Sequence, residues 1–190
     1  MIAFKKQYFF IIESTKDINL RNIKKYNKFV IVYRNNKSPE QIEVLKRFRN
    51  HCRLKLIKFF VANDKSLAIN LKADGLYISA FNNSLRLLSL QRDSFTIIGS
   101  AHNLKEIYFK NKQRCNTIFF SKLYPVDYDK NAKTLGLIKF NNFLQLSKNI
   151  IPLGGIKIKN LNSIKNISCH GFALFSEIKK KPANIINRLF

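Results

Sequence analysis

The architecture is most readily predicted from Ile150-Ile151-Pro152-Leu153-Gly154-Gly155-Ile156. This stretch joins a short apolar run to two adjacent glycines, and Gly171-Phe172-Ala173-Leu174-Phe175-Ser176 repeats the pattern further on, as an apolar run that ends in a small hydroxyl residue. Short runs of this kind are typical of strands buried on both faces. We therefore predict two buried strands here, each followed by a turn.

Similar runs recur along the rest of the 190 residues, and polar segments with helical spacing lie between them. The predicted strands are Tyr8 to Ile12, Phe29 to Tyr33, Leu56 to Ala62, Gly75 to Ser79, Phe95 to Gly99, Thr117 to Phe120, Ile150 to Leu153 and Gly171 to Phe175. Strands that alternate with helices form either a closed barrel or an open doubly wound sheet, and eight strands favour the barrel. We predict a trimmed (β/α)8 TIM barrel, an α/β fold, as a single domain over residues 1–190, because no linker rich in Gly, Pro or Ser interrupts the chain.

Helices are predicted where apolar residues recur at helical spacing after a capping residue. The predicted helices are 40–48, 84–90, 104–111 and 140–147. Ser38 is the expected cap of the first, with Pro39 at its first position. The polar segment from Val126 to Ala132 is the expected mobile loop.

The formal charge of +24 raises the question of a nucleic-acid partner. Lys and Arg are dispersed through most segments, however, so a drift of composition towards Lys, Asn and Ile explains the charge better than a dedicated surface does. We expect nucleic acid to bind non-specifically if at all, and anionic small substrates to be attracted. A homo-oligomer is left open.

Cys52, Cys115 and Cys169 are odd in number and have no CxxC spacing. This argues against a disulfide framework or a zinc site and for a reduced, cytoplasmic protein with buried thiols. The apolar run that ends at Ile12 is too short for a signal peptide core or a membrane span, so we expect no membrane partner.

The loops that follow the last two strands predict a phosphate site. Gly154 and Gly155 expose backbone N–H groups ahead of a helix, which is a sound basis for anion binding, although an ordinary tight turn is an equal alternative. Ser176 follows the next strand after Phe175. In TIM barrels these two loops commonly form a phosphate cup, so we expect a phosphorylated small molecule as substrate.

Polar residues follow three of the earlier strands. Asp64, beside Asn63, is either an Mg²⁺ ligand or a helix cap, and the cap is favoured. Ser100 and His102 face the same way if extended, and His102 is a candidate general acid or base, with a loop histidine as the equal alternative. This pattern argues against a serine hydrolase, because we expect no orienting carboxylate nearby.

After the second strand, Arg34 and Lys37 are a candidate phosphate clamp. In a chain with 35 Lys and Arg, two basic residues in one loop are also expected by chance.

In this order the motifs resemble the thiamine phosphate synthase / TenI family. The similar segments are Asn63-Asp64, Ala73-Asp74-Gly75-Leu76-Tyr77-Ile78, Ile98-Gly99-Ser100-Ala101-His102, Leu123-Tyr124-Pro125, Leu135-Gly136-Leu137, Leu153-Gly154-Gly155-Ile156 with Asn160, and Gly171 to Ser176. The resemblance implies a TIM barrel and, for the synthase, the joining of hydroxymethylpyrimidine diphosphate to thiazole phosphate with Mg²⁺ in thiamine biosynthesis.

The resemblance also implies roles for particular residues. It assigns thiazole phosphate to Gly154, Gly155, Phe175 and Ser176, the diphosphate to Arg34, Asn63, Lys37 and Lys130, Mg²⁺ to Asp64, and proton transfer to His102 with Ser100. The chain departs from the family at Asn82, which stands where the synthase has its second metal carboxylate, and in the loops of Lys37 and Lys130, where the motifs are altered. A weakened synthase, a TenI-like thiazole tautomerase and a non-catalytic phosphate-ligand or nucleic-acid binding protein are therefore the alternatives.

Overall fold

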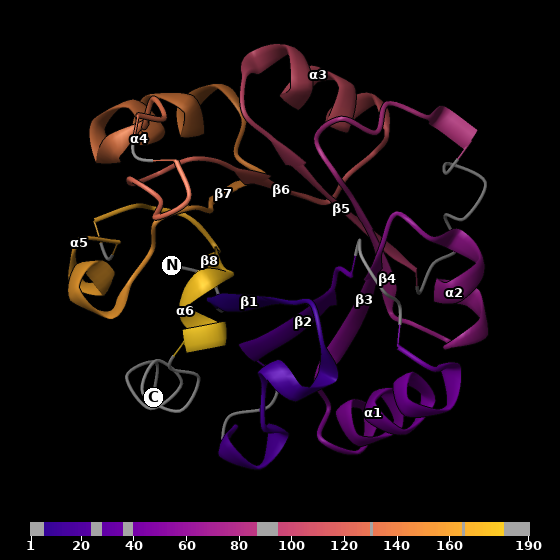
Figure 1. The fold of residues 1–190 in the computed structure, drawn as a ribbon. Helices are drawn as coiled ribbons and strands as arrows, with labels where there is room; N and C mark the ends of the chain where they lie inside the picture. Colours follow the sequence, from indigo (N-terminus) through magenta and orange to yellow (C-terminus); the bar gives the residue numbers. More distant parts are fainter. Residues whose placement is uncertain are drawn as a thin grey trace, which may run out of the picture.

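A computed structural model describes residues 6–23, 28–35, 40–86, 95–129, 131–164 and 166–180. Its sheet has eight parallel strands in the order β7-β6-β5-β4-β3-β2-β1-β8, and β7 lies beside β8 at the seam, so the sheet curls into a nearly closed barrel (Figure 1). The prediction of a TIM barrel in place of an open sheet is confirmed. The strands are β1 (Gln7–Ile12), β2 (Phe29–Tyr33), β3 (Lys58–Ala62), β4 (Gly75–Ile78), β5 (Thr96–Ala101), β6 (Thr117–Phe120), β7 (Ile150–Pro152) and β8 (Gly171–Leu174).

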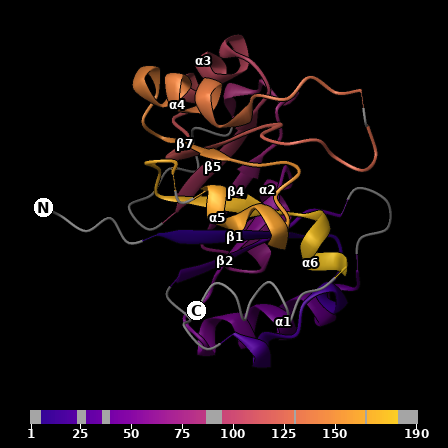
Figure 2. The same ribbon diagram turned by 90° about the vertical axis from the view of Figure 1, so that its left-hand side faces the viewer.

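Helices surround this barrel and connect consecutive strands (Figure 1). They are α1 (Ile42–Leu54), α2 (Lys65–Asn70), α3 (Leu104–Lys112), α4 (Gly136–Leu146), α5 (Leu161–Ile164) and α6 (Ser176–Lys180), with short 3₁₀ turns η1 (Thr15–Asp17), η2 (Leu20–Asn22) and η5 (Ile158–Asn160). In the side view of Figure 2, β1 starts at the end of the barrel marked N, and α6 lies at the opposite end. We call these the amino-terminal and carboxyl-terminal ends of the barrel, after the strand ends that they carry.

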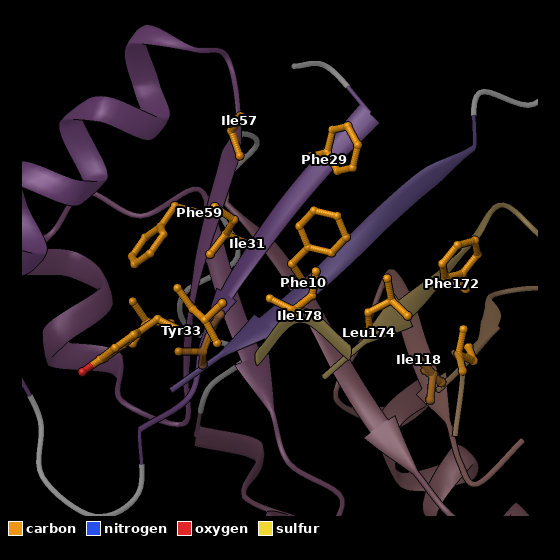
Figure 3. Packing of buried hydrophobic residues seen from close by; sticks show 14 of the residues in the cluster. Phe10, Phe29, Ile31, Tyr33, Ile57, Phe59, Ile118, Phe172, Leu174 and Ile178 are labelled. Carbon is orange, nitrogen blue, oxygen red and sulfur yellow. The ribbon is translucent and has the colours of Figure 1, made fainter. Parts of the chain in front are cut away.

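Alternate residues of each strand pack on opposite faces of the sheet, as the period of two requires. In β1, Phe9 and Ile11 belong to a cluster inside the barrel, whereas Phe10 and Ile12 belong to the larger cluster between strands and helices. Figure 3 shows part of that outer cluster, including Phe10 and Phe59. Because both faces of the strands are buried, their sequences are apolar throughout, which is why they could be recognised.

Helices occur where the described residues cover the predicted segments, but some first and last residues differ from the prediction. The first helix begins at Ile42 after Gln41, whose side chain makes no capping bond, so the expected start at Ser38 and Pro39 was wrong for the helix, and those two residues lie outside the described ones. The start shifts because Leu45, Phe48 and Cys52 set the buried stripe. Most of the predicted helix 84–90 also lies outside the described residues.

The three cysteines are free and buried, as predicted. Burial raises the pKa of the Cys52 thiol to about 12, and the pKa of Cys115 rises to about 12 for the same reason. Both thiols are therefore protonated and unreactive at neutral pH. Within the described part of the chain, none of the helices has the length and apolar character needed to cross a bilayer.

Candidate active site

A cavity of about 340 Å³ opens at the carboxyl-terminal end of the barrel. Its floor includes Ile11, Tyr77 and Ala173, which come from three different strands of the inner cluster. Its walls are residues that follow β2, β4, β5, β6, β7 and β8. This is where parallel barrels place their active sites.

Seven of the residues selected from the sequence line this one cavity. They are Arg34, Ser100, His102, Gly154, Gly155, Phe175 and Ser176. Asn63 and Asp64 do not line it. Lys37 and Lys130 lie outside the described residues. The loops after β7 and β8 therefore do converge on a common space, as the expected phosphate cup requires.

The two glycines have a backbone conformation that disfavours a side chain, and Gly155 also lacks the room for one. Gly154 has φ of +92° and Gly155 has φ of +65°, a region that favours glycine. A Cβ on Gly155 would lie 2.4 Å from the carbonyl oxygen of Pro125 and 2.5 Å from that of Tyr124. The loop after β7 is thus pressed against the loop after β6, and its backbone can approach a ligand without an intervening side chain.

The inner wall of the cavity carries a buried hydroxyl pair. Tyr77 points inward because its strand alternates, and its hydroxyl donates to Oγ of Ser100 over 2.9 Å. Burial raises the pKa of Tyr77 above its ordinary value, so the phenol stays a neutral donor. Ser100 accepts from Tyr77, and its own hydroxyl hydrogen is left to turn towards the cavity. Ser100 was predicted from the sequence, whereas Tyr77 was not, because the only sign of its role is a hydroxyl group within a run of buried apolar residues.

His102 is held by a carboxylate that the sequence analysis did not find. Nδ1 of His102 lies 3.0 Å from Oε2 of Glu106, and the backbone N–H of His102 donates to the same oxygen over 2.7 Å. Asn103 caps α3, which brings its first-turn Glu106 back over His102. The expectation that no orienting carboxylate is near was therefore wrong, and the spacing of four residues at a helix start was the available signal.

The pairing also sets the charge of Glu106. Partial burial raises its pKa, but hydrogen bonds from His102 and Asn103 outweigh burial and bring the pKa below its usual value. An ionised Glu106 keeps the hydrogen of the His102 ring on Nδ1 and leaves Nε2 available to exchange a proton.

Two lysines that the sequence analysis passed over also line the cavity. Lys122 follows β6 and Lys157 follows the glycine pair. Lys122 pairs with Asp129 at 3.1 Å. Lys157 pairs with Asp127 at 2.5 Å, and Asp127 also accepts from Lys180 of α6 at 2.7 Å. These contacts tie together the loops after β6, β7 and β8. Lysine is so common in this chain that the sequence could not single these two residues out. Only their position in the fold shows that they line the cavity.

Asp64 and Asn63, which were expected to bind Mg²⁺ and the diphosphate, have other partners. Asp64 caps α2, where its Oδ1 accepts from the N–H of Leu67 over 2.8 Å. Asn63 accepts from the N–H of Ser79 over 2.9 Å and also contacts the Ser79 hydroxyl, which links the ends of β3 and β4. No cluster of three or more His, Cys, Asp and Glu occurs among the described residues. The donors present fit poorly the two-carboxylate Mg²⁺ site that the resemblance implies, and Mg²⁺ at Asp64 stays a prediction.

Comparisons with known proteins agree on one family. The family model described as thiamine monophosphate synthase matches residues 16–178. The thiamine-phosphate synthase of Latilactobacillus sakei is 29% identical over 131 residues, which are 67% of this chain and 58% of that protein. That of Persephonella marina is 26% identical over 159 residues, 80% of this chain and 74% of that protein. The matched part thus spans a little under two thirds of the L. sakei protein.

Solved structures support the fold. The thiamine phosphate pyrophosphorylase of Pyrococcus furiosus superposes with a TM-score of 0.73 at 19% identity and covers 95% of this chain and 96% of that one. A 3-hexulose-6-phosphate synthase superposes with a TM-score of 0.69 at 10% identity, covering 96% and 97%. At such low identity these structures show a shared barrel only. Because the family model matches residues 16–178, which are most of this chain, the chain belongs to the thiamine monophosphate synthase family.

Proposed function

We propose that the chain is a thiamine phosphate synthase-type transferase that joins hydroxymethylpyrimidine diphosphate to thiazole phosphate in its cavity. The observation that supports this most is the convergence of Gly155 and Ser176 on one cavity in a member of this family. Arg34, Lys122 and Lys157 line the same cavity and would neutralise a phosphate. In this proposal, the phosphate of the thiazole lies against the glycine loop and Ser176.

The chemistry requires a leaving diphosphate to be stabilised. As the bond between the two substrates forms, the carbon–oxygen bond to the diphosphate breaks and negative charge collects on the departing group. Arg34 and Lys122 line the cavity and are the described cations placed to bind that charge, and one such donor is often worth about 3 kcal/mol in the transition state.

Isothermal titration of the pure protein with thiazole phosphate tests the phosphate site. We expect saturable binding that Ser176→Ala weakens. A protein that shows no heat of binding at millimolar ligand would overturn the proposal. Binding without formation of thiamine phosphate, when the pyrimidine diphosphate and Mg²⁺ are added, would exclude the synthase and leave a thiazole tautomerase or a non-catalytic phosphate-ligand protein.

A thiazole tautomerase is a second candidate, which the His102–Glu106 pair favours. A histidine whose Nδ1 is fixed by a carboxylate, with its Nε2 available at a cavity, can take a proton from one atom of a bound substrate and return it to another. His102→Gln should then abolish tautomerisation, while Glu106→Gln should lower its rate and alter its pH profile. An unchanged rate in His102→Gln would reject this candidate.

A further inference from the structure

The amino-terminal end of the barrel, opposite the cavity, carries a ring of cations. They lie just before strands, at the start of β3, or at the last residues of helices: Lys6, Lys28, Arg53, Lys55, Lys58, Lys72, Lys112, Arg114 and Lys148. All are at least partly exposed. We call this set the basic end surface. It involves the segments that lead into six of the eight strands and therefore surrounds the barrel.

Carboxylates are segregated to the other end. Among the described residues, all acidic side chains except Asp74 follow strands or lie in the first turns of helices at the cavity end. Asp74 precedes β4, and its carboxylate is already paired with Arg49 at 3.1 Å. A drift of composition towards Lys would not sort the carboxylates in this way.

Helix dipoles explain only part of the sorting. They favour carboxylates in first turns and cations in last turns, as at Glu106 and Lys112. They do not explain Lys6, Lys28, Lys58 and Lys148, which lie on or next to strand starts. The excess of cations over carboxylates among the described residues of this end is therefore not a by-product of helix capping alone.

Three turns of this end hold large side chains in a backbone conformation that suits glycine. Leu56, Lys72 and Arg114 follow α1, α2 and α3, with φ of 54°, 48° and 54°. Each turn closes with a backbone bond across it, such as Ile57 N–H to Cys52 oxygen at 2.9 Å. Glycine or asparagine is the usual residue at this position of a helix end. Leucine and two cations occupy it here in spite of the strain, which indicates a use for these side chains.

Exposed leucines accompany the cations. Leu54 is 82% exposed and Leu56 is 75% exposed, on either side of Lys55 in the turn before β3. Leu146, at the end of α4 and close to Lys148, is 74% exposed. In Figure 1 the helices α1 and α4 lie on different sides of the ring, so the apolar side chains are not confined to one edge of this end.

We propose that the basic end surface docks the protein on an anionic phospholipid bilayer. Leucines among lysines and arginines are the combination that a bilayer interface binds, since the apolar groups enter the acyl boundary and the cations meet the headgroups. The spread of these residues around the barrel suits a wide, flat partner. A nucleic-acid strand would use the cations and leave the leucines unexplained.

This mode of binding fits the rest of the molecule. It leaves the cavity at the opposite end open to solvent. The expectation of no membrane partner rested on the shortness of the apolar run ending at Ile12, and binding to a membrane surface requires no spanning segment.

Vesicle flotation of the full chain tests the proposal. The vesicles contain phosphatidylcholine alone or phosphatidylcholine mixed with phosphatidylglycerol. We expect binding to the anionic vesicles only, weakening as salt rises. Leu54→Ser combined with Leu56→Ser should lower the affinity at least about tenfold, equivalent to about 1.4 kcal/mol.

Matched variants at the other end provide the controls. Leu104→Ser with Ile138→Ser removes two exposed apolar side chains from the first turns of α3 and α4, and it should change binding little. Lys58→Gln with Lys72→Gln should weaken binding more than Lys105→Gln with Lys139→Gln, although both pairs lower the net charge equally. Circular dichroism shows that each variant is folded.

Several results would overturn the proposal. One is the absence of binding to anionic vesicles, and another is equal loss in the variants of both ends, which would show attraction by net charge alone. A leucine variant that dissociates an oligomer without changing flotation would assign the leucines to a second copy of the chain. Binding of a single-stranded RNA that the leucine variant retains, without vesicle binding, would assign the surface to nucleic acid.

Discussion

Gly155 shows how a single residue fixes the candidate phosphate site. Its positive φ and its contact with the carbonyls of Tyr124 and Pro125 both exclude a side chain. Gly136 has the same φ of +65°, but a Cβ there would meet nothing within 4 Å. Comparing alanine variants of the two glycines therefore separates the free-energy cost of the backbone conformation from that of the steric clash.

We predict that Gly155→Ala weakens thiazole phosphate binding at least tenfold and lowers the free energy of unfolding by more than Gly136→Ala does. Gly136→Ala adds backbone strain alone, about 1 kcal/mol or slightly more. Gly155→Ala must also push the loop after β7 away from the loop after β6. Titration calorimetry and urea unfolding measure the two effects. Equal loss of stability in both variants, with binding intact, would contradict the prediction.

Individual site residues could be predicted from the sequence where an unusual residue type directly follows an apolar run. The glycine pair, Ser100 and His102 follow apolar runs and were found from that pattern. Glu106 was missed because its role depends on the first turn of α3 folding back over His102. Lys122 and Lys157 were missed because lysine is common here, and only the path of two loops places them in the cavity.

The loop after β6 shows how an element can regulate access to the site. Asp127 lines the cavity and binds Lys157, which also lines it, and Lys180 of α6, which does not. Its carboxylate therefore neutralises one cation that the proposed phosphate would otherwise use. Hydrogen bonds from these two lysines lower the pKa of Asp127 from 3.8 to about 2. The carboxylate is therefore charged at every physiological pH and competes with an anionic ligand.

We predict that Asp127→Asn raises the affinity for thiazole phosphate about two- to fivefold at low salt, the range expected for an exposed ion pair. Asp64→Asn, measured in magnesium-free buffer, is the matched control, because Asn caps a helix about as well as Asp and this position is outside the cavity. Calorimetry at two salt concentrations measures both. A lower affinity in Asp127→Asn would mean that the loop must be latched for the ligand to bind.

The same link has a defined pH dependence. Because the folded pKa of Asp127 is depressed, its contribution to folding is complete above the ordinary value of 3.8 and is lost as the pH falls towards about 2. Urea unfolding of wild type and Asp127→Asn should therefore differ at pH 6 and converge near pH 2. If the unfolding curves of wild type and Asp127→Asn still differed near pH 2, the difference would not come from the ionised Asp127 carboxylate.

Elements were predictable where the periodicity was strong. All eight strands were found because both faces are buried, and α3 was found because Asn103 caps it. The start of α1 was predicted wrongly because Ser followed by Pro, as at Ser38 and Pro39, is common at the start of a helix. The position of this helix is set instead by the packing of Leu45 and Phe48. The brief α2 and α5 have too few residues for a period to show.

At the scale of the whole molecule, the order of eight short runs predicted a closed barrel, and the closure itself depends on long-range contacts. The charge distribution was the main surprise. Along the chain the cations look evenly dispersed, but the alternation of strand and helix brings every second connection to the same end, and that is how a basic end arises from a dispersed pattern. No reading of linear spacing could show this before the fold was known.

Asp74 links the barrel to its outer helices at that end. Its Oδ2 accepts from the N–H of Phe59 at 2.7 Å, and its Oδ1 accepts from Arg49 of α1, which also donates to the Lys72 carbonyl at 3.1 Å. Arg49 is only 8% exposed, whereas the side chain of Asp74 is 33% exposed, so this partly buried pair joins α1, β3 and the turn after α2.

We predict that Asp74→Asn lowers the free energy of unfolding by about 2 kcal/mol, the range for hydrogen bonds to charged groups. Asparagine replaces one of the two carboxylate oxygens with an NH2 group, so a donor would face either the N–H of Phe59 or the guanidinium of Arg49. The guanidinium is also left without a compensating charge. Urea unfolding measures the loss, with Asp64→Asn as the control that keeps its cap. Because the cavity lies at the opposite end, thiazole phosphate affinity should be unchanged wherever the variant is folded, and a loss of affinity without loss of stability would show that the two ends are coupled.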